Sequence, residues 1–151
     1  MLKKILLLLL IVFAVMQFIQ IDVSVPTDAE SKIDFLAKYN VPEDISKLVK
    51  DGCYDCHSYE TEYKWYMHIA PISWLTKGHV EDGRKHLNFS DWDAYDLRKK
   101  VHKLEECYEE IEGYKMPIPG YITMHPEADF DQADREKLIA WFKEMEQTIT
   151  N

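Results

Sequence analysis

Residues 41–57, VPEDISKLVKDGCYDCH, combine the pattern of a short helix with two cysteines three positions apart and a histidine directly after the second. Pro42 stands where a helix begins, and the acidic Glu43 and Asp44 suit the positive end of a helix dipole. The apolar residues that follow are at helical spacing: Ile45, Leu48 and Val49. We therefore predict a short helix that leads directly into Cys53–His57.

The segment Cys53–His57, CYDCH, has several possible uses. The chain has one further cysteine, Cys107, so the total is odd, whereas a disulfide framework needs an even number. A thioredoxin-like pair follows a strand, and the sequence contains no strand pattern. Zinc needs two more ligands, but there is no second Cys-x-x-Cys and no His-x-x-x-His. The spacing is instead that of the c-type haem attachment motif, Cys-x-x-Cys-His.

The chemistry of attachment explains this spacing. Each thiol adds across one of the two haem vinyl groups, and a three-residue step on a helical turn places both sulfurs along one porphyrin edge. The next residue, His57, is then positioned to bind the iron from the proximal side. We therefore expect one haem c, attached covalently through Cys53 and Cys56, with His57 as an iron ligand.

The first 21 residues differ from the rest of the chain. Lys3 and Lys4 precede an apolar run from Ile5 to Met16 that continues through Phe18 and Ile19, about the length of a membrane-spanning helix. We predict an N-terminal membrane anchor that leaves the N-terminus in the cytoplasm and the rest of the chain outside. A cleaved signal, which would release the protein to the periplasm, is the alternative.

The remaining residues fit one acidic domain. Because Lys3 and Lys4 are two of the 18 basic residues, the chain after them has 16 basic and 27 acidic residues, a formal charge of −11. Nucleic acid is therefore a poor partner. Residues 22–40 are polar and mixed, and we interpret them as a tether with a short helical piece around 33–39. The domain is expected to start near Val41 and to extend to residue 151.

The pattern after the motif predicts an all-α domain. Residues 58–92 are rich in aromatic side chains and contain Gly78 and Gly83, which we interpret as turn glycines between loops and short helices. A capping pattern at Ser90 predicts a helix that runs to about Glu112, where Gly113 ends it. Asp131 is expected to cap a last amphipathic helix. The sequence contains no internal repeat and no low-complexity segment.

The sixth position on the iron has more than one candidate. Met116 is followed by Pro117, and Pro119 comes soon after, so this segment cannot be helical. A methionine on such an extended loop is suited to be the sixth haem ligand, with His86 and His125 as alternative ligands. His68, His79 and His102 also follow the motif, and an open position is a further alternative. We assign no function to Cys107.

The order of these elements resembles a class I cytochrome c. The finer pattern is similar to the bacterial haem-binding domain family over nearly the whole chain. The matching features are an N-terminal anchor followed by CYDCHS, WY at 65–66, IAPISWL, GRKHLNFSDW, KMP and MHPEA. The resemblance implies a cytochrome c-like helical domain around one covalent haem, on the periplasmic side of the bacterial inner membrane. It also implies that a proline carbonyl, here that of Pro71, accepts a hydrogen bond from the proximal His57.

These expectations lead to two possible functions. In the first, the domain is an electron carrier and not an enzyme, and it exchanges single electrons with redox partner proteins that are themselves associated with the membrane. In the second, the sixth iron position is open or labile, and the domain is a haem-based gas or redox sensor or has peroxidase-like activity, with His86 or His125 as acid–base residue. Electron transfer is the favoured interpretation.

Overall fold

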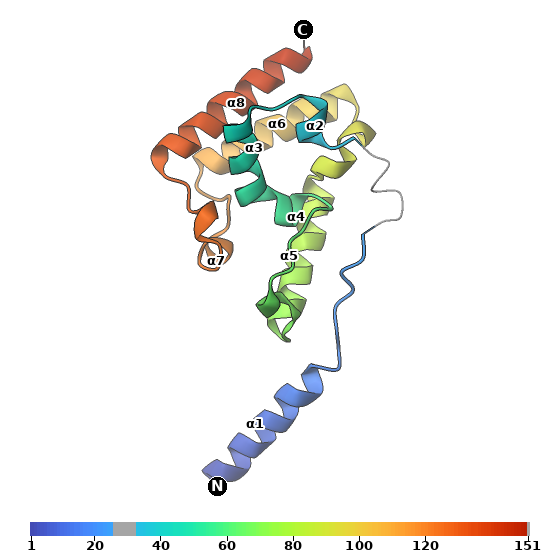
Figure 1. Ribbon diagram of the computed structural model, residues 1–151, viewed down its shortest axis with the longest axis vertical. Helices are drawn as coiled ribbons and strands as arrows, with labels where there is room; N and C mark the ends of the chain where they lie inside the picture. The colour runs from blue at the N-terminus through green and yellow to red at the C-terminus, as the bar shows by residue number, and fades with distance from the viewer. Residues whose placement is uncertain (26–32, 151) are drawn as a thin grey trace.

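The computed structural model describes residues 1–25 and 33–150, and these residues form helices and loops with no strand (Figure 1). The α-helices are α1 (Leu2–Met16), α2 (Phe35–Lys38), α3 (Glu43–Val49), α4 (Asp55–His57), α5 (Ile72–His86), α6 (Leu97–Glu112), α7 (Pro119–Ile122) and α8 (Gln132–Thr150). A π-helix, η2, spans Lys50–Tyr54, and three 3-10 helices are η3 (Trp65–His68), η4 (Phe89–Ala94) and η5 (Pro126–Ala128). The predicted all-α fold class is confirmed.

The core lies between α3, α6 and α8 and is closed by α2 and η4. α6 and α8 pack along each other, and α3 crosses α8 before the chain turns toward α4 and α5 (Figure 1). The largest buried side chains come from α2, η4, α6 and α8: Phe35, Phe89, Trp92, Leu104, Leu138 and Phe142. Helix α3 adds Ile45 and Val49 to this core, and α4 lies at its edge with α5 beside it (Figure 1).

The packed domain begins earlier than the expected boundary at Val41. Phe35 and Leu36 on α2 are buried in the core, and the ring centroids of Phe35 and Trp92 are 4.6 Å apart. Asp34 caps α2 by accepting a hydrogen bond from the Leu36 amide at 2.9 Å. The short helix expected around 33–39 is thus confirmed, but it belongs to the domain because its aromatic side chain fills the core. Of the expected tether, residues 26–32 lie outside the described residues.

The prediction of loops and short helices for residues 58–92 is wrong at α5. This element is one 15-residue helix, Ile72–His86, and both presumed turn glycines lie inside it. Pro71 occupies the N-cap position, so it marks the start of the helix. Gly78 and Gly83 do not break α5, because the surrounding structure outweighs the low helix propensity of glycine.

The helix predicted from Ser90 to Glu112 ends at Glu112 as expected, but it begins at Leu97 and not at Ser90. Asn88 caps the separate 3-10 helix η4, and α6 then starts at Leu97, where the Asp96 carboxylate accepts a hydrogen bond from the Lys99 amide at 2.8 Å. Gly113 is the C-cap of α6, as expected. Asp131 caps α8 by accepting a hydrogen bond from the Asp134 amide at 2.9 Å, also as expected.

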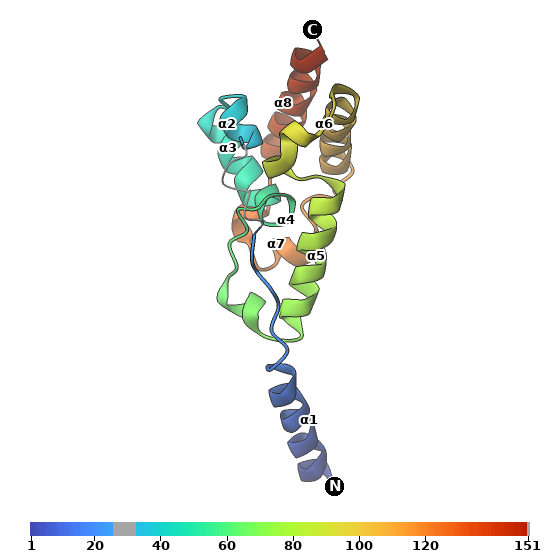
Figure 2. The same ribbon diagram turned by 90° about the vertical axis from the view of Figure 1, so that its right-hand side faces the viewer.

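The N-terminal helix α1 extends from one end of the molecule, opposite the end where α8 terminates (Figures 1 and 2). None of its side chains is buried. In the described ranges, no helix has both the length and the apolar character that a membrane crossing requires. The prediction of a membrane-spanning helix at the N-terminus is therefore not supported.

Candidate functional site

The predicted attachment motif lies on one continuous helical segment. α3 runs without a break into the π-helix η2, which contains Cys53, and then into α4, which contains Cys56 and His57. The π-helical turn is a local departure from α-helical geometry, and such turns are often found at functional sites. The backbone becomes extended at Ser58, where φ is −146° and ψ is 179°. The short helix expected before the motif is confirmed, and the motif occupies its last turn and a half.

Both motif cysteines are free, half-buried thiols. Burial raises the pKa of the Cys53 thiol to about 12, and the neighbouring Cys56 adds to the shift. Burial and the Asp55 carboxylate raise the pKa of the Cys56 thiol to about 11. Neither sulfur is a thiolate near neutral pH.

In the ranges 1–25 and 33–150, no group of three or more His, Cys, Asp or Glu side chains is arranged to hold a metal ion.

The Nδ1 nitrogen of His57 is engaged by the protein. Its Nδ1 lies 3.1 Å from the Leu87 carbonyl oxygen, and since a carbonyl only accepts, Nδ1 carries the proton and donates it. Nε2 is then the nitrogen with a lone pair for a metal. Burial lowers the pKa of His57, which keeps the imidazole neutral and able to ligate.

The hydrogen-bond partner of His57 differs from the one that the resemblance implied. Pro71 lies exposed at the start of α5, and its carbonyl oxygen accepts hydrogen bonds from the amides of Trp74 and Leu75 at 3.1 and 3.3 Å. That carbonyl is used by the first turn of α5. Leu87 directly follows the last turn of the same helix, where the backbone is extended, and its carbonyl faces the histidine. The prediction for Pro71 is therefore wrong.

The helix α5 lies against the motif because Gly83 has no side chain. A Cβ at Gly83 would come within 2.5 Å of the Cys56 carbonyl oxygen, a distance that real contacts do not allow. The next residue, Arg84, donates from Nε to the Ser58 carbonyl at 2.7 Å and from Nη2 to the Thr61 hydroxyl at 2.9 Å. Together these contacts fix the C-terminal half of α5, and with it Leu87, against the chain that contains His57.

The segment after α6 packs on the opposite flank of the same motif. A Cβ at Gly52, the residue before Cys53, would come within 2.5 Å of the Phe130 ring and 3.1 Å of Pro117 Cγ. Pro117 directly follows the candidate ligand Met116. The structure thus brings the loop that contains Met116 against the turn that contains Cys53, two regions more than 60 positions apart in the sequence.

The backbone of Met116 is fixed at both of its polar groups. Its amide donates to the Glu110 carbonyl at 3.1 Å, and its carbonyl accepts a hydrogen bond from Arg135 Nη1 at 3.1 Å. Arg135 is buried, and its guanidinium lies 4.6 Å from the centre of the Tyr114 ring. The Met116 side chain is half-buried. Nothing in the sequence pointed to Arg135, because its position in the first turn of α8 did not distinguish it from a surface residue.

His125, one of the alternative iron ligands, is buried in a polar network. Its ring stacks on that of Tyr121 with 3.8 Å between centroids, and its Nδ1 lies 3.1 Å from the Tyr121 carbonyl oxygen. Its Nε2 lies 3.2 Å from the Tyr66 hydroxyl and 3.7 Å from an Asp55 carboxylate oxygen. Because both ring nitrogens have protein partners, His125 is poorly placed to bind iron.

The other histidines are exposed. His86 is the last residue of α5 and lies near enough to His57 to influence the pKa of that residue. His68, His79 and His102 are also exposed, as expected for His102. The third cysteine, Cys107, is a half-buried free thiol packed against the core.

Asp55, between the two motif cysteines, connects the motif to the segment that contains α7. One carboxylate oxygen accepts a hydrogen bond from the Tyr121 hydroxyl at 2.9 Å, and the other accepts one from the Glu62 amide at 2.8 Å. The Tyr121 hydroxyl also lies 3.2 Å from the Asp51 carbonyl oxygen. Burial, together with the Asp55 carboxylate, raises the pKa of Tyr121, so its phenol remains a donor. No local pattern in the sequence pointed to this link.

These features fit a covalently attached haem. Two free thiols lie three residues apart on one helical segment, and the neutral imidazole that follows them presents Nε2. Packing on both flanks of the segment fixes its backbone.

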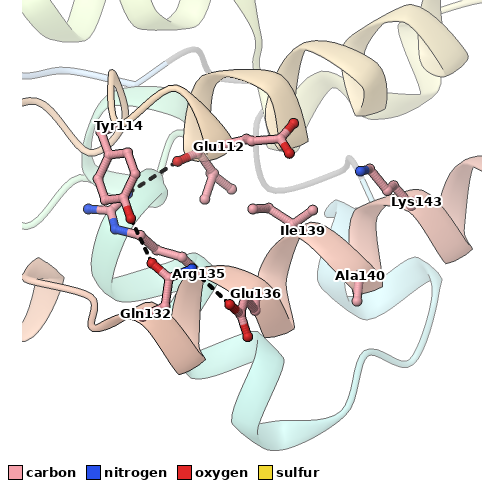
Figure 3. Close-up of a pocket in the computed structure, with 9 residues that line it drawn as sticks. Glu112, Tyr114, Gln132, Arg135, Glu136, Ile139, Ala140 and Lys143 are labelled. Carbon is pink, nitrogen blue, oxygen red and sulfur yellow. Dashed lines mark hydrogen bonds between the residues drawn. The ribbon is translucent and has the colours of Figure 1, made fainter.

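A different hollow, with a volume of about 390 Å³, lies between the end of α6 and α8 (Figure 3). Its lining includes Tyr114, Arg135 and Ile139 but none of the motif residues. A second one, of about 160 Å³, is lined by Asp55, Tyr121 and several charged side chains. Neither pocket contains Cys53, Cys56 or His57.

Comparison with known proteins identifies one relationship. A family model described as a haem-binding domain matches residues 11–144, from within α1 to within α8. No curated protein and no solved structure matches the chain.

Proposed function

The chain belongs to the haem-binding domain family, and we propose that it is a c-type cytochrome domain that has one covalently attached haem and transfers single electrons. One observation carries the proposal. Cys53 and Cys56 share a helical segment with His57, whose Nδ1 is engaged by the Leu87 carbonyl while Nε2 remains available. A proximal ligand needs this arrangement, because the hydrogen bond from Nδ1 to the Leu87 carbonyl fixes the tautomer and the plane of the ring.

Each residue of the site then has a defined part in the proposal. Cys53 and Cys56 would hold the haem through thioether bonds, and His57 and Met116 would ligate its iron. When bound, haem supplies an iron that cycles between its ferrous and ferric states. The Leu87 carbonyl raises the basicity of His57 Nε2, and the soft thioether of Met116 favours ferrous iron.

Two observations support Met116 as the sixth ligand ahead of the histidines. The adjacent Pro117 packs on Gly52, so the methionine loop lies against the motif. His125, the buried alternative, has both ring nitrogens engaged by other protein groups. With two protein ligands on the iron, the domain is an electron carrier and not an enzyme, because no coordination position remains for a substrate.

We further propose that the domain works outside the cytoplasm, at the outer face of the cytoplasmic membrane. Lys3 and Lys4 followed by the apolar α1 are typical of a segment that directs export. This segment also associates the protein with the membrane, on the periplasmic side of a bacterial inner membrane. Its partners are then redox proteins that are membrane-associated themselves.

Covalent attachment is tested by extracting the purified holoprotein with acidified acetone. Haem that is held by two thioether bonds remains with the polypeptide, also during denaturing electrophoresis. The double variant Cys53→Ala/Cys56→Ala is expected to release all of its haem. Cys107→Ala is the matched control, since it removes the third thiol and should retain covalent haem. Extraction of haem from the wild-type protein would contradict the proposal.

A further inference from the structure

The end of the domain nearest to α1 presents an apolar surface. Trp65 is 74% exposed, Leu75 is 63% exposed, and Ile72 and Trp74 are 45% and 36% exposed. These four residues lie on η3 and the first turn of α5, and we call them the 65–75 face. Large apolar side chains that gather on one exposed surface are a feature of sites that contact another protein or a membrane.

The 65–75 face is joined by hydrogen bonds to the segment that follows α1. The Gln17 side chain donates to the Ala70 carbonyl at 3.0 Å and accepts a hydrogen bond from the Ala70 amide at 3.0 Å. The Trp74 indole donates to the Ile19 carbonyl at 3.0 Å. Both views show α1 extending away from the end of the molecule where α5 begins (Figures 1 and 2). The face therefore lies at the base of an apolar helix that has no buried side chain.

The distribution of acidic residues marks the same surface. The chain has 27 aspartates and glutamates, yet none lies between Tyr63 and Val80, and none precedes Asp22. These two acid-free stretches are the ones that the hydrogen bonds of Gln17 and Trp74 hold together. A surface that contacts lipid must avoid carboxylates, whereas a surface facing only water has no such restriction.

From these observations we propose that the 65–75 face rests on the lipid surface and sets the orientation of the domain on the membrane. The inference rests on the proposed membrane association of the N-terminal segment. Tryptophan side chains suit this position, because an indole combines a large apolar ring with a polar N–H and accumulates at the membrane–water interface. A second copy of the chain is a weaker candidate, since it would have to cover α1 and the face together.

The test measures how deep one residue of the face lies when the full-length holoprotein is bound to phosphatidylcholine vesicles. Leu75→Cys is labelled with an environment-sensitive fluorophore in a Cys107→Ala background. Leu97→Cys is the matched control, because Leu97 is a similarly exposed leucine, 55% against 63%, on α6 in the half of the molecule away from α1. Lipids that carry a nitroxide in the acyl chain act as quencher.

Severalfold stronger quenching at position 75 than at position 97 is the expected result. Adding Trp65→Ser and Ile72→Ser should reduce the quenching at position 75 by at least half, because the face then loses its contact with lipid. Quenching that stays unchanged in this variant overturns the inference.

Three other outcomes are also decisive. A protein that floats with the vesicles while the label at 75 remains in water refutes the inference but leaves membrane association intact. A protein that does not bind vesicles refutes both. A label that becomes shielded without lipid, as protein concentration rises, identifies a second copy as the occupant and overturns the lipid assignment.

Discussion

The two flanks of the attachment motif are held in different ways. On the flank of α5, the contacts to the motif itself involve backbone: Gly83 lies against the Cys56 carbonyl, and the Leu87 carbonyl accepts a hydrogen bond from His57. The Arg84 side chain, also on this flank, bonds to Ser58 and Thr61, which follow the motif. On the flank of residues 113–130, they involve side chains: the Phe130 ring packs on Gly52, and the Tyr121 phenol bonds to Asp55.

This difference separates the two candidate axial ligands. The partner of His57 is a carbonyl group that any residue at position 87 would supply, so its geometry depends on how closely α5 approaches the motif. The position of Met116 depends on particular side chains, among them Arg135, which bonds to its carbonyl. We therefore expect the histidine flank to be sensitive to added volume and the methionine flank to be sensitive to the loss of specific groups.

The largest expected effect is that of Met116→Ala, which removes the proposed sixth ligand on the side-chain flank. Without the thioether, ferrous iron loses its preferred ligand, so the midpoint potential should fall, within the range of about 0.8 V over which axial ligands act. The variant should also bind added cyanide or carbon monoxide. Redox titration and visible absorption spectra of the holoprotein measure both properties.

Met124→Ala is the control for this experiment, because Met124 lies exposed in the same segment and should alter neither property. An unchanged spectrum for Met116→Ala, together with high-spin iron in His86→Ala or His125→Ala, would show that the sixth ligand is a histidine. A wild-type protein that is already high spin and binds carbon monoxide would favour the sensor or peroxidase-like alternative over electron transfer.

The next effect concerns the backbone flank and its tolerance for volume. Gly83→Ala places a methyl group 2.5 Å from the Cys56 carbonyl oxygen, and a backbone atom has little freedom to move. We expect the free energy of unfolding to fall by about 1–3 kcal/mol, the usual cost of overpacking. Denaturant unfolding of the holoprotein measures it.

Gly78→Ala is the matched substitution within the same helix. A Cβ at Gly78 meets no atom within 4 Å, so alanine should stabilise α5 by up to about 1 kcal/mol through helix propensity. Equal stability of the two variants would mean that α5 does not approach the motif as closely as described.

The smallest effect is expected from one hydroxyl group on the side-chain flank. Tyr121→Phe removes the hydrogen bond to Asp55 and should lower the free energy of unfolding by about 1 kcal/mol. Tyr114→Phe is the control, since the Tyr114 hydroxyl bonds to Gln132 at the surface and its loss should cause no measurable change. If both variants unfold like the wild type, the Tyr121 phenol does not connect the two segments, and the side-chain flank is weaker than proposed.

Several features of this protein follow from the sequence by itself, because they depend on spacing along the chain. The Cys53–His57 motif predicted haem binding, which membership of the haem-binding domain family confirms. Helical periodicity predicted α3, α6 and α8, and Gly113 and Asp131 marked two of their ends. Periodicity and capping are local properties, so one stretch of sequence is enough to recognise them.

Other features were decided only when distant segments came together. Leu87 accepts the hydrogen bond of His57 through its backbone carbonyl. Because every residue has a backbone carbonyl, the residue type at position 87 could not show that it is the partner. Glycine is typical of turns, yet Gly83 lies inside α5. A glycine is needed there because the Cys56 carbonyl leaves no room for a side chain. Phe35 belongs to the core and not to a tether because its ring meets Trp92, 57 positions later in the chain. In each case the deciding contact joins residues far apart in sequence, and only the tertiary structure contains it.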